Sequence, residues 1–323
     1  MAASPAHALD KSEIALPEPA KRWSIDYSFD TSVGIGSFLR VGTLSSTYSY
    51  VASGLTLNPA YQWKINRQTI STSLKGEISF EWTVPDNADG RRFEWSDVSL
   101  GLALPDAWEN QKQGLKFNVG LTLSLPCSRV SLLLHKYLDV GLGFSLTKKN
   151  PKVGASVSVS SSATKNFSRY PSVTMEPNAV LSNPLLFDRG NEGLMSGPIT
   201  TGAVLYEWGW SNKIALSFSP PRVPWLGFSL ALGLRNRWKY DVAPNQDALT
   251  APNARAGRGR SDSTSGNFEI SFGLPLHLGL ALGLTSVQPL RTPDNREFYV
   301  PFFNFEGMEN NFTNVYLGLS GSI

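Results

Sequence analysis

The chain has 323 residues, of which 41% are hydrophobic, 11% are aromatic and only 17% are charged, a composition that excludes intrinsic disorder. The net charge of +3 is far from the strongly basic field of a nucleic-acid-binding protein, and the single cysteine excludes an intramolecular disulfide and a cysteine-based metal site. No stretch approaches the roughly 18 consecutive apolar residues of a transmembrane helix, whereas a β-barrel would hide its apolar residues at alternate positions.

Residues 1–20 contain several prolines but no basic segment followed by an apolar one, so they predict a flexible tail rather than an intact secretory signal. Ala6, His7 and Ala8 match the small-residue pattern at which exported proteins are cleaved. We therefore expect an exported chain whose N-terminal tail lies in the periplasm. A cytosolic protein with a proline-rich start is the alternative.

The segments 204–218 and 226–240 alternate between bulky apolar residues and small or charged ones. The bulky positions are Tyr206, Trp208, Trp210, Ile214, Leu216 and Phe218 in the first segment and Leu226, Phe228, Leu230, Leu232, Leu234, Trp238 and Tyr240 in the second. The segments 74–84 and 115–125 repeat this pattern. A period of two predicts β-strands, and only 129–138 is a candidate helix.

A soluble β-sandwich also alternates, so the length and composition of the strands decide between the two architectures. Soluble strands usually have about five or six residues, whereas a tilted strand that crosses a membrane needs about 9 to 11, and 204–218 and 226–240 are longer still. Their second face carries glycine, alanine, serine and charge rather than large apolar side chains. Bulky residues outside and small polar residues inside indicate a transmembrane β-barrel.

Twelve strands are predicted, an even number, as single-chain bacterial barrels require. They span 23–39, 45–57, 72–84, 93–104, 114–125, 138–147, 153–163, 202–219, 225–240, 267–274, 277–287 and 312–322. The short joins at 148–152, 220–224 and Pro275 are expected in the periplasm. The long joins near 164–201, 241–266 and 288–311 are expected outside the cell, so residues 21–323 form a single all-β, up-and-down antiparallel barrel domain.

Aromatic residues gather at the predicted outer ends of the strands, as in the aromatic girdle of a membrane barrel. They are Trp82, Phe93, Trp95, Tyr206, Trp208, Trp210, Trp238, Tyr240, Phe268, Phe312 and Tyr316. In this pattern the sequence resembles the bacterial outer-membrane β-barrel proteins as a class, over about residues 21 to 323. The resemblance is to the class and to no particular family within it, and it implies an outer-membrane location.

The sequence offers little catalytic chemistry. The three histidines are too few and too scattered for a histidine-rich metal site, and we expect neither metal nor cofactor. Ser131, His135 and Asp139 are spaced by four and would share one face of a helix, which suggests an acyl-transfer triad only if 129–139 is helical. Packing of a short loop helix is the simpler interpretation, and we expect no enzyme.

The inward face is therefore the candidate functional surface. Glycine, alanine and serine leave space in it, and the charged candidates for lining a pore are Arg235, Arg237, Lys239, Lys75, Glu77, Glu81 and Glu207. The alternative is that the small residues accommodate a plug, the N-terminal tail or strong barrel curvature, while the arginines extend into the membrane interface.

These features favour a pore for small polar solutes in the bacterial outer membrane. The second hypothesis is a structural barrel that anchors an envelope-spanning secretion, motility or adhesion complex through its loops. The expected partners are the lipid bilayer, lipopolysaccharide and a small polar solute, with other envelope proteins under the second hypothesis and no nucleic acid.

Overall fold

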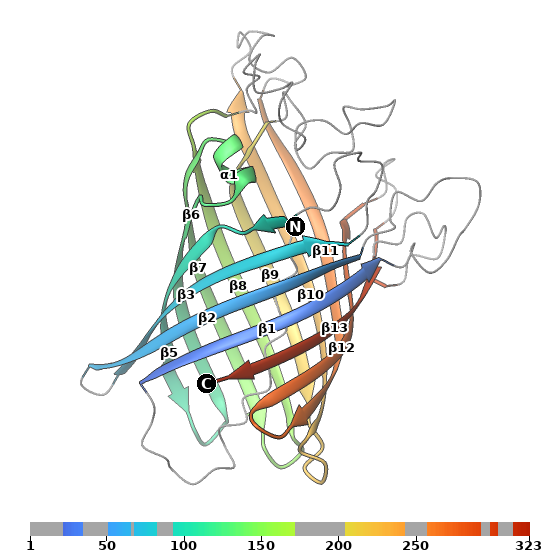
Figure 1. Cartoon of the computed structure of the whole chain (residues 1–323). Coiled ribbons are helices and arrows are strands. Elements are labelled where there is room, and N and C mark those ends of the chain that lie inside the picture. Colours follow the sequence, from blue (N-terminus) through green and yellow to red (C-terminus); the bar gives the residue numbers. More distant parts are fainter. Residues whose placement is uncertain are drawn as a thin grey trace.

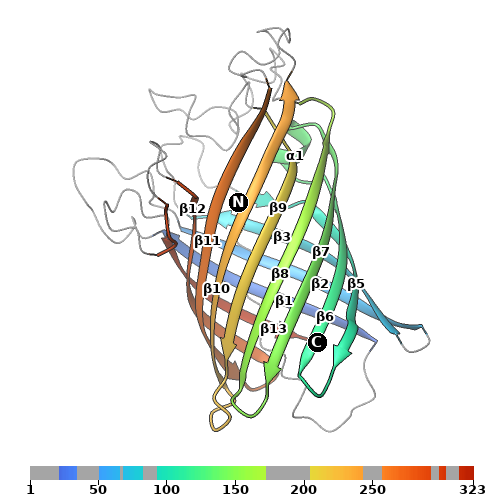
Figure 2. The same cartoon turned by 180° about the vertical axis from the view of Figure 1, so that it is seen from behind.

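The computed structural model describes residues 22–34, 51–65, 68–82, 93–171, 204–242, 257–291, 298–302 and 313–323. The described residues form one antiparallel sheet that closes on itself as a barrel (Figures 1 and 2). The predicted N-terminal tail, 1–20, lies outside the described residues. The all-β barrel expected from the alternation of residues is thereby confirmed.

Neighbouring strands in the chain are hydrogen-bonded neighbours in the sheet, and β2 pairs with β3 while β1 pairs with β13, so the ring has no free edge. The strands are β1 (Trp23–Gly34), β2 (Val51–Ile65), β3 (Gln68–Glu81), β4 (Phe93–Trp95), β5 (Val98–Asn110), β6 (Leu115–Leu125), β7 (Lys136–Asn150), β8 (Ala155–Ser168), β9 (Tyr206–Phe218), β10 (Leu226–Val242), β11 (Gly257–Leu274), β12 (Leu278–Pro289) and β13 (Thr313–Ser322).

The short β4 is not a separate member of the ring. Both β4 and β5 pair with β3, β4 through Trp95 opposite Ile78 and β5 through Ser99 opposite Lys75. They are therefore two pieces of one strand that is interrupted at residues 96–97. Counted in this way, the barrel has twelve strands, as the sequence predicted.

Each strand sends alternate side chains to opposite faces, and residues that pair directly across the ladder share a face. On β9 and β10 the exposed apolar residues Ile214, Leu216, Leu230 and Leu232 lie at even positions and point outward. In the described part of the chain Ala52 is the only buried hydrophobic residue. The apolar residues thus form an outer belt rather than an interior core.

The two ends of the barrel differ in the length of their connections. At one end, here called the turn end, the strands are joined by 66–67, 111–114, 151–154, 219–225 and 275–277. At the other, the loop end, the joins are 35–50, 82–92, 126–135, 169–205, 243–256 and 290–312. The chain enters β1 and leaves β13 at the turn end. The predicted short joins at 148–152, 220–224 and Pro275 all fall at this end.

Glycines with positive φ close two of the tight turns, Gly114 between β5 and β6 and Gly154 between β7 and β8. Gly154 has a φ of 72°, and a Cβ there would lie 1.9 Å from the carbonyl oxygen of Ser219. Its own carbonyl accepts a 2.8 Å hydrogen bond from the Ser219 amide, which ties the β7–β8 turn to the end of β9. No other residue would satisfy both the positive φ and this close approach.

Several predicted strand boundaries are wrong. The second strand, predicted to end at residue 57, continues through Pro59, which pairs with Ile25 of β1, to Ile65, and its predicted first part at 45–50 lies outside the described residues. The strand predicted at 267–274 begins at Gly257, so the join expected at 241–266 is shortened to 243–256. Residues 257–266 contain no bulky apolar residue and carry no alternating signal, although their backbone pairs with β10 and β12.

The join expected at 164–201 also begins later, because β8 continues to Ser168. Near 288–311, β12 extends to Pro289, and Arg291 then bridges to Phe298. The one helix in the described ranges, α1 (Arg129–Leu133), has five residues and lies at the loop end. Within those ranges, no helix has the length and apolar character needed to cross a membrane.

Candidate functional site

The inward face of the barrel is defined by the strand register, because direct cross-strand partners share a face. Taking Ser229 and Arg235 of β10 as inward, the pairings carry this face around the sheet. The inward positions of β8 and β9 are Ser156, Ser158, Ser160, Ser162 and Thr164, and Gly209, Ser211, Lys213, Ala215 and Ser217. None of these side chains is apolar and larger than alanine, so this wall does not build a packed interior.

Basic side chains line the inward face of β10 toward the loop end. Arg235 pairs with Ser211, and Arg237 pairs with Gly209. The Arg237 guanidinium carbon lies 4.9 Å from the ring centroid of Tyr206, and Lys239 Nζ lies 5.9 Å from it. The three cations predicted from the sequence therefore share one inward wall, here called the basic wall. Arg235 remains exposed within the barrel.

Acidic side chains gather on the inward face of β1 and β3. A Cβ built on Gly54 of β2 would lie 3.3 Å from Asp30 Oδ1 and 3.7 Å from Glu77 Oε1, so the two carboxylates converge over this glycine. Lys75 is inward on β3 as the partner of Ser99. Glu81 holds an inward register position opposite Ala52. Asp30 and Glu77 define what is here called the acidic wall.

A third acidic residue, Glu269 of β11, is only 4% exposed. Tyr316 of β13 donates a hydrogen bond to Glu269 Oε2 at 2.7 Å, and the Tyr316 hydroxyl oxygen also lies 3.1 Å from Asn267 Oδ1. The Tyr316 ring crosses Gly283 of the intervening β12, where a Cβ would lie 2.3 Å from the ring. A buried carboxyl group is thus stabilised by a hydrogen bond that reaches across one strand.

Asp30 and Glu269 are not among the residues predicted to line the pore, and Tyr316 is predicted in the aromatic girdle instead. The signal was present, because Asp30 alternates with outward Phe29 and Glu269 with outward Phe268. Tyr316 alternates with the bulky residues Val315 and Leu317, so the period of two itself places it on the inward face, where it pairs with Gly283. Its aromatic ring, and not its position in the alternation, suggested the girdle. Tyr206 is a second girdle residue that contacts the basic wall instead.

Glu207 requires a correction, because it does not line the interior. Trp238 pairs with Trp208 and Lys239 pairs with Tyr206, so Glu207 is an extra residue in a β-bulge. Its carboxylate binds Lys165 and Arg258, which occupy outward register positions. A bulge breaks the strict alternation on which the sequence prediction depended.

The suggested triad of Ser131, His135 and Asp139 is not assembled. The helix ends at Leu133, and Ser131 donates to Asp97 rather than to a histidine. Asp139 instead accepts a 2.6 Å hydrogen bond from Lys136. The His135 ring packs edge-on against Tyr170, at 5.3 Å between centroids. These residues anchor the loop end and do not form a nucleophile and base.

Asp97 holds the start of α1. It accepts hydrogen bonds from the Ser128 amide at 2.9 Å and from the Ser131 hydroxyl, and Lys136 Nζ lies 3.8 Å away. Burial opposes the charged form of Asp97, but these hydrogen bonds and the lysine outweigh burial and lower its pKa below the usual value. Asp97 is therefore ionised at neutral pH and fixes α1 against β5.

Metal chemistry has no evident place in the described part of the barrel, where no three histidine, cysteine or acidic side chains converge as potential ligands. The free cysteine, Cys127, is exposed at the loop end. The candidate site is the charged inward surface of the barrel.

Comparison with known proteins gives the fold a class. The structure resembles an outer membrane channel from Pseudomonas putida F1, with 13% identity, coverage of 98% of this chain and 100% of that chain, and a TM-score of 0.52. It also matches Escherichia coli outer membrane phospholipase A (10% identity, 96% and 93% coverage, TM-score 0.40) and Pseudomonas aeruginosa OccK8 (9%, 94% and 98%, TM-score 0.37). No family model and no curated protein sequence matches the chain. The protein has the fold of the bacterial outer-membrane β-barrels.

Proposed function

We propose that this protein is a pore in the bacterial outer membrane through which small polar solutes pass. The proposal rests on the exposure of Arg235 and Lys213, whose side chains face inward and are nevertheless exposed. Charged side chains remain exposed inside a closed barrel only where water reaches them, because burying an isolated charge is costly. A water-filled interior is the physical requirement for conduction.

The size of the barrel supports the same function. About eight strands enclose an interior that side chains fill, whereas 16 to 18 leave a wide aqueous channel. A ring of twelve lies between these limits, so the inward residues decide whether a path remains. The serines, glycines and alanines of β8, β9 and β10 occupy little of that space.

The outer surface supports the membrane location. Bulky apolar residues form a belt around the barrel, and Trp82, Trp95, Trp208 and Trp210 are exposed where this belt approaches the loop end. Short periplasmic turns and long outer loops are usual in such barrels, so we place the turn end in the periplasm. The channel from Pseudomonas putida F1, which shares the fold, is itself an outer membrane protein.

Swelling of proteoliposomes in uncharged sugars tests the proposal. Liposomes that contain the full chain should swell in small sugars and progressively less in larger ones. Ser160→Trp places a large ring on the inward face and should slow the swelling, whereas Val159→Trp, on the adjacent outward position, should not. No swelling with the folded wild-type protein would contradict the pore and favour the anchoring role.

A further inference from the structure

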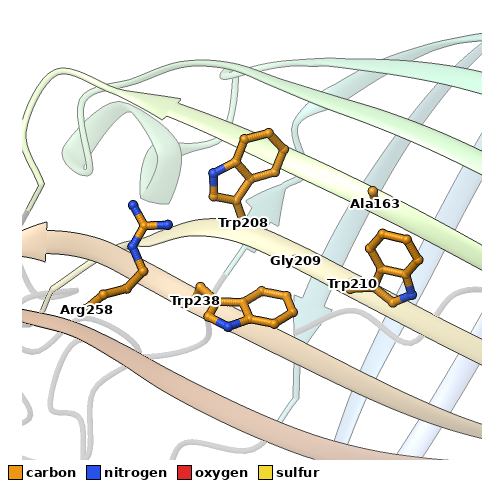
Figure 3. Close-up of a pocket in the computed structure, with 6 residues that line it drawn as sticks. All are labelled: Ala163, Trp208, Gly209, Trp210, Trp238 and Arg258. Carbon is orange, nitrogen blue, oxygen red and sulfur yellow. The ribbon is translucent and has the colours of Figure 1, made fainter.

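A hollow on the outer surface of the barrel, near the loop end, is separate from the inward face. It has a volume of about 290 Å³ and is lined by Ala163, Trp208, Gly209, Trp210, Trp238 and Arg258 (Figure 3). Trp208 and Trp210 are 42% and 47% exposed. Indole rings and one guanidinium group therefore frame a recess that opens away from the barrel interior.

The outward direction of this hollow follows from the register. Trp210 pairs with Ala163, and Trp208 pairs with Trp238. Arg260 pairs with Trp238, and Arg258 follows at the next position of the same face of β11. The recess thus extends over the outer surface of four consecutive strands, from β8 to β11.

Positively charged side chains border the recess. The Arg258 side chain is 44% exposed, and its Nη2 lies 2.8 Å from Glu207 Oε2. Lys165 binds the same carboxylate. Lys165 Nζ also lies 4.6 Å from the Trp208 ring centroid. Two cations share the Glu207 carboxylate, and Asp241 lies directly opposite Arg258 in the β10–β11 ladder, so two cations and two carboxylates meet beside the indole rings.

Arg258 and Lys165 lie at the height on the barrel where the outer apolar belt ends. Toward the turn end, the same outward face carries Ile214, Leu216 and Phe218 on β9 and Leu230, Leu232 and Leu234 on β10. Arg258 and Lys165 lie just beyond this apolar belt, close to the loop ends of their strands. In the membrane orientation proposed above, this is the headgroup level of the outer leaflet, where basic side chains are tolerated on the lipid face.

We propose that the recess binds a phosphorylated glycolipid of the outer leaflet, namely lipopolysaccharide. Arg258 and Lys165 pair with a phosphate of the lipid, since guanidinium and ammonium groups are the usual partners of phosphate. Trp208 and Trp238 support the sugar and the upper part of the acyl chains, because indole rings combine an apolar body with a polar edge. The inference rests on the proposed outer-membrane location but not on conduction.

Native mass spectrometry of the full chain in detergent, titrated with bisphosphorylated lipid A, tests this site. Lys165→Gln/Arg258→Gln should bind the lipid about tenfold more weakly than the wild type, because charge-assisted hydrogen bonds are lost. Lys148→Gln is the matched control, since Lys148 is an exposed outward cation at the turn end. Fully dephosphorylated lipid A should bind the wild type and the double variant equally.

Equal binding of bisphosphorylated lipid A by the wild type and the double variant would overturn the proposal. A wild type that does not distinguish the two forms of lipid A would also overturn it. The double variant should conduct like the wild type, because both residues lie on the outer surface. Loss of lipid binding with retained conductance thus tests the lipid site, whereas absence of conductance in both proteins would contradict only the pore.

Discussion

Glu77 and Arg235 lie on opposite walls of the barrel. Glu77 is on β3 and Arg235 on β10, and six steps separate these strands either through β9, β8, β7, β6 and β5 or through β11, β12, β13, β1 and β2. Figure 1 shows β3 at the front, and Figure 2, from behind, shows β10 there. The interior is therefore bounded by the acidic wall on one side and the basic wall on the other, and in the proposed pore a solute would pass between them.

The basic wall should give the pore a weak preference for anions, partly offset by the acidic wall. Arg235→Ser/Arg237→Ser should weaken this preference, measured as the reversal potential across a salt gradient. The effect should fade above about 0.1 M salt, where the Debye length falls below about 10 Å. Arg260→Ser is the control, because Arg260 lies on the outward face. Unchanged selectivity in the double variant would remove these arginines from the conduction path.

The Tyr316–Glu269 pair should contribute to folding stability. Tyr316→Phe leaves the buried carboxyl of Glu269 without its 2.7 Å donor and should cost about 1 to 3 kcal/mol in urea unfolding from detergent or lipid. Glu269→Gln supplies the companion variant of a double-mutant cycle. Costs that simply add in the double variant would show that the two side chains do not interact.

Substitutions at two adjacent positions of β10 test which of its side chains face lipid and which face the interior. Leu230→Arg places a charge on the outward apolar belt and should cost about 2 to 4 kcal/mol near the bilayer midplane. Ser229→Arg introduces the same side chain on the inward face and should be mild. Refolding titrations into lipid give both values. Equal costs would contradict the assignment of the two faces.

Labelling of Cys127 can show how the barrel is oriented in the outer membrane. Cys127 is exposed between β6 and α1 at the loop end, so a bulky membrane-impermeant maleimide should label it on intact cells. Ser219→Cys in a Cys127→Ser background places a thiol at the turn end. That thiol should react only after the outer membrane is broken. The reverse pattern would mean that the barrel is inserted the other way.

The contacts of Asp97 predict that the stability of α1, at the loop end, depends on pH. Because its pKa lies below the usual value, the stabilisation of α1 is present at neutral pH and is lost as pH falls through the folded-state pKa. Amide exchange of 128–133, corrected for the intrinsic rate, should show constant protection down to about pH 4, close to the ordinary pKa of aspartate, and a loss below it. Asp97→Asn should weaken this protection at neutral pH. Protection that is independent of both pH and the substitution would contradict the role of Asp97.

The sequence predicts the barrel well where alternation is strong, as on β9 and β10, because lipid and water demand different side chains at successive positions. It predicts less where neither face carries bulky apolar side chains. Residues 257–266 have polar side chains on both sides, and only backbone pairing defines them as strand. The second strand was predicted to end at residue 57, yet β2 continues through Pro59, which pairs with Ile25.

The candidate site was only partly predictable for a related reason. Arg235, Arg237 and Lys75 follow from alternation, which is a local property. The bulge that turns Glu207 outward depends on how β9 aligns with β10. The convergence of Asp30 with Glu77 depends on how β1 and β3 align with β2, which lies between them. Such relationships depend on register between strands, which the period of a single strand does not specify.

Single-channel recording of the purified full chain in a planar lipid bilayer tests the proposed function most directly. Discrete conductance steps are expected, with a modest anion preference that decreases in Arg235→Ser/Arg237→Ser. Folded protein should be confirmed by the heat-dependent shift in its electrophoretic mobility before each recording. A bilayer that contains the folded barrel and stays silent would contradict the pore.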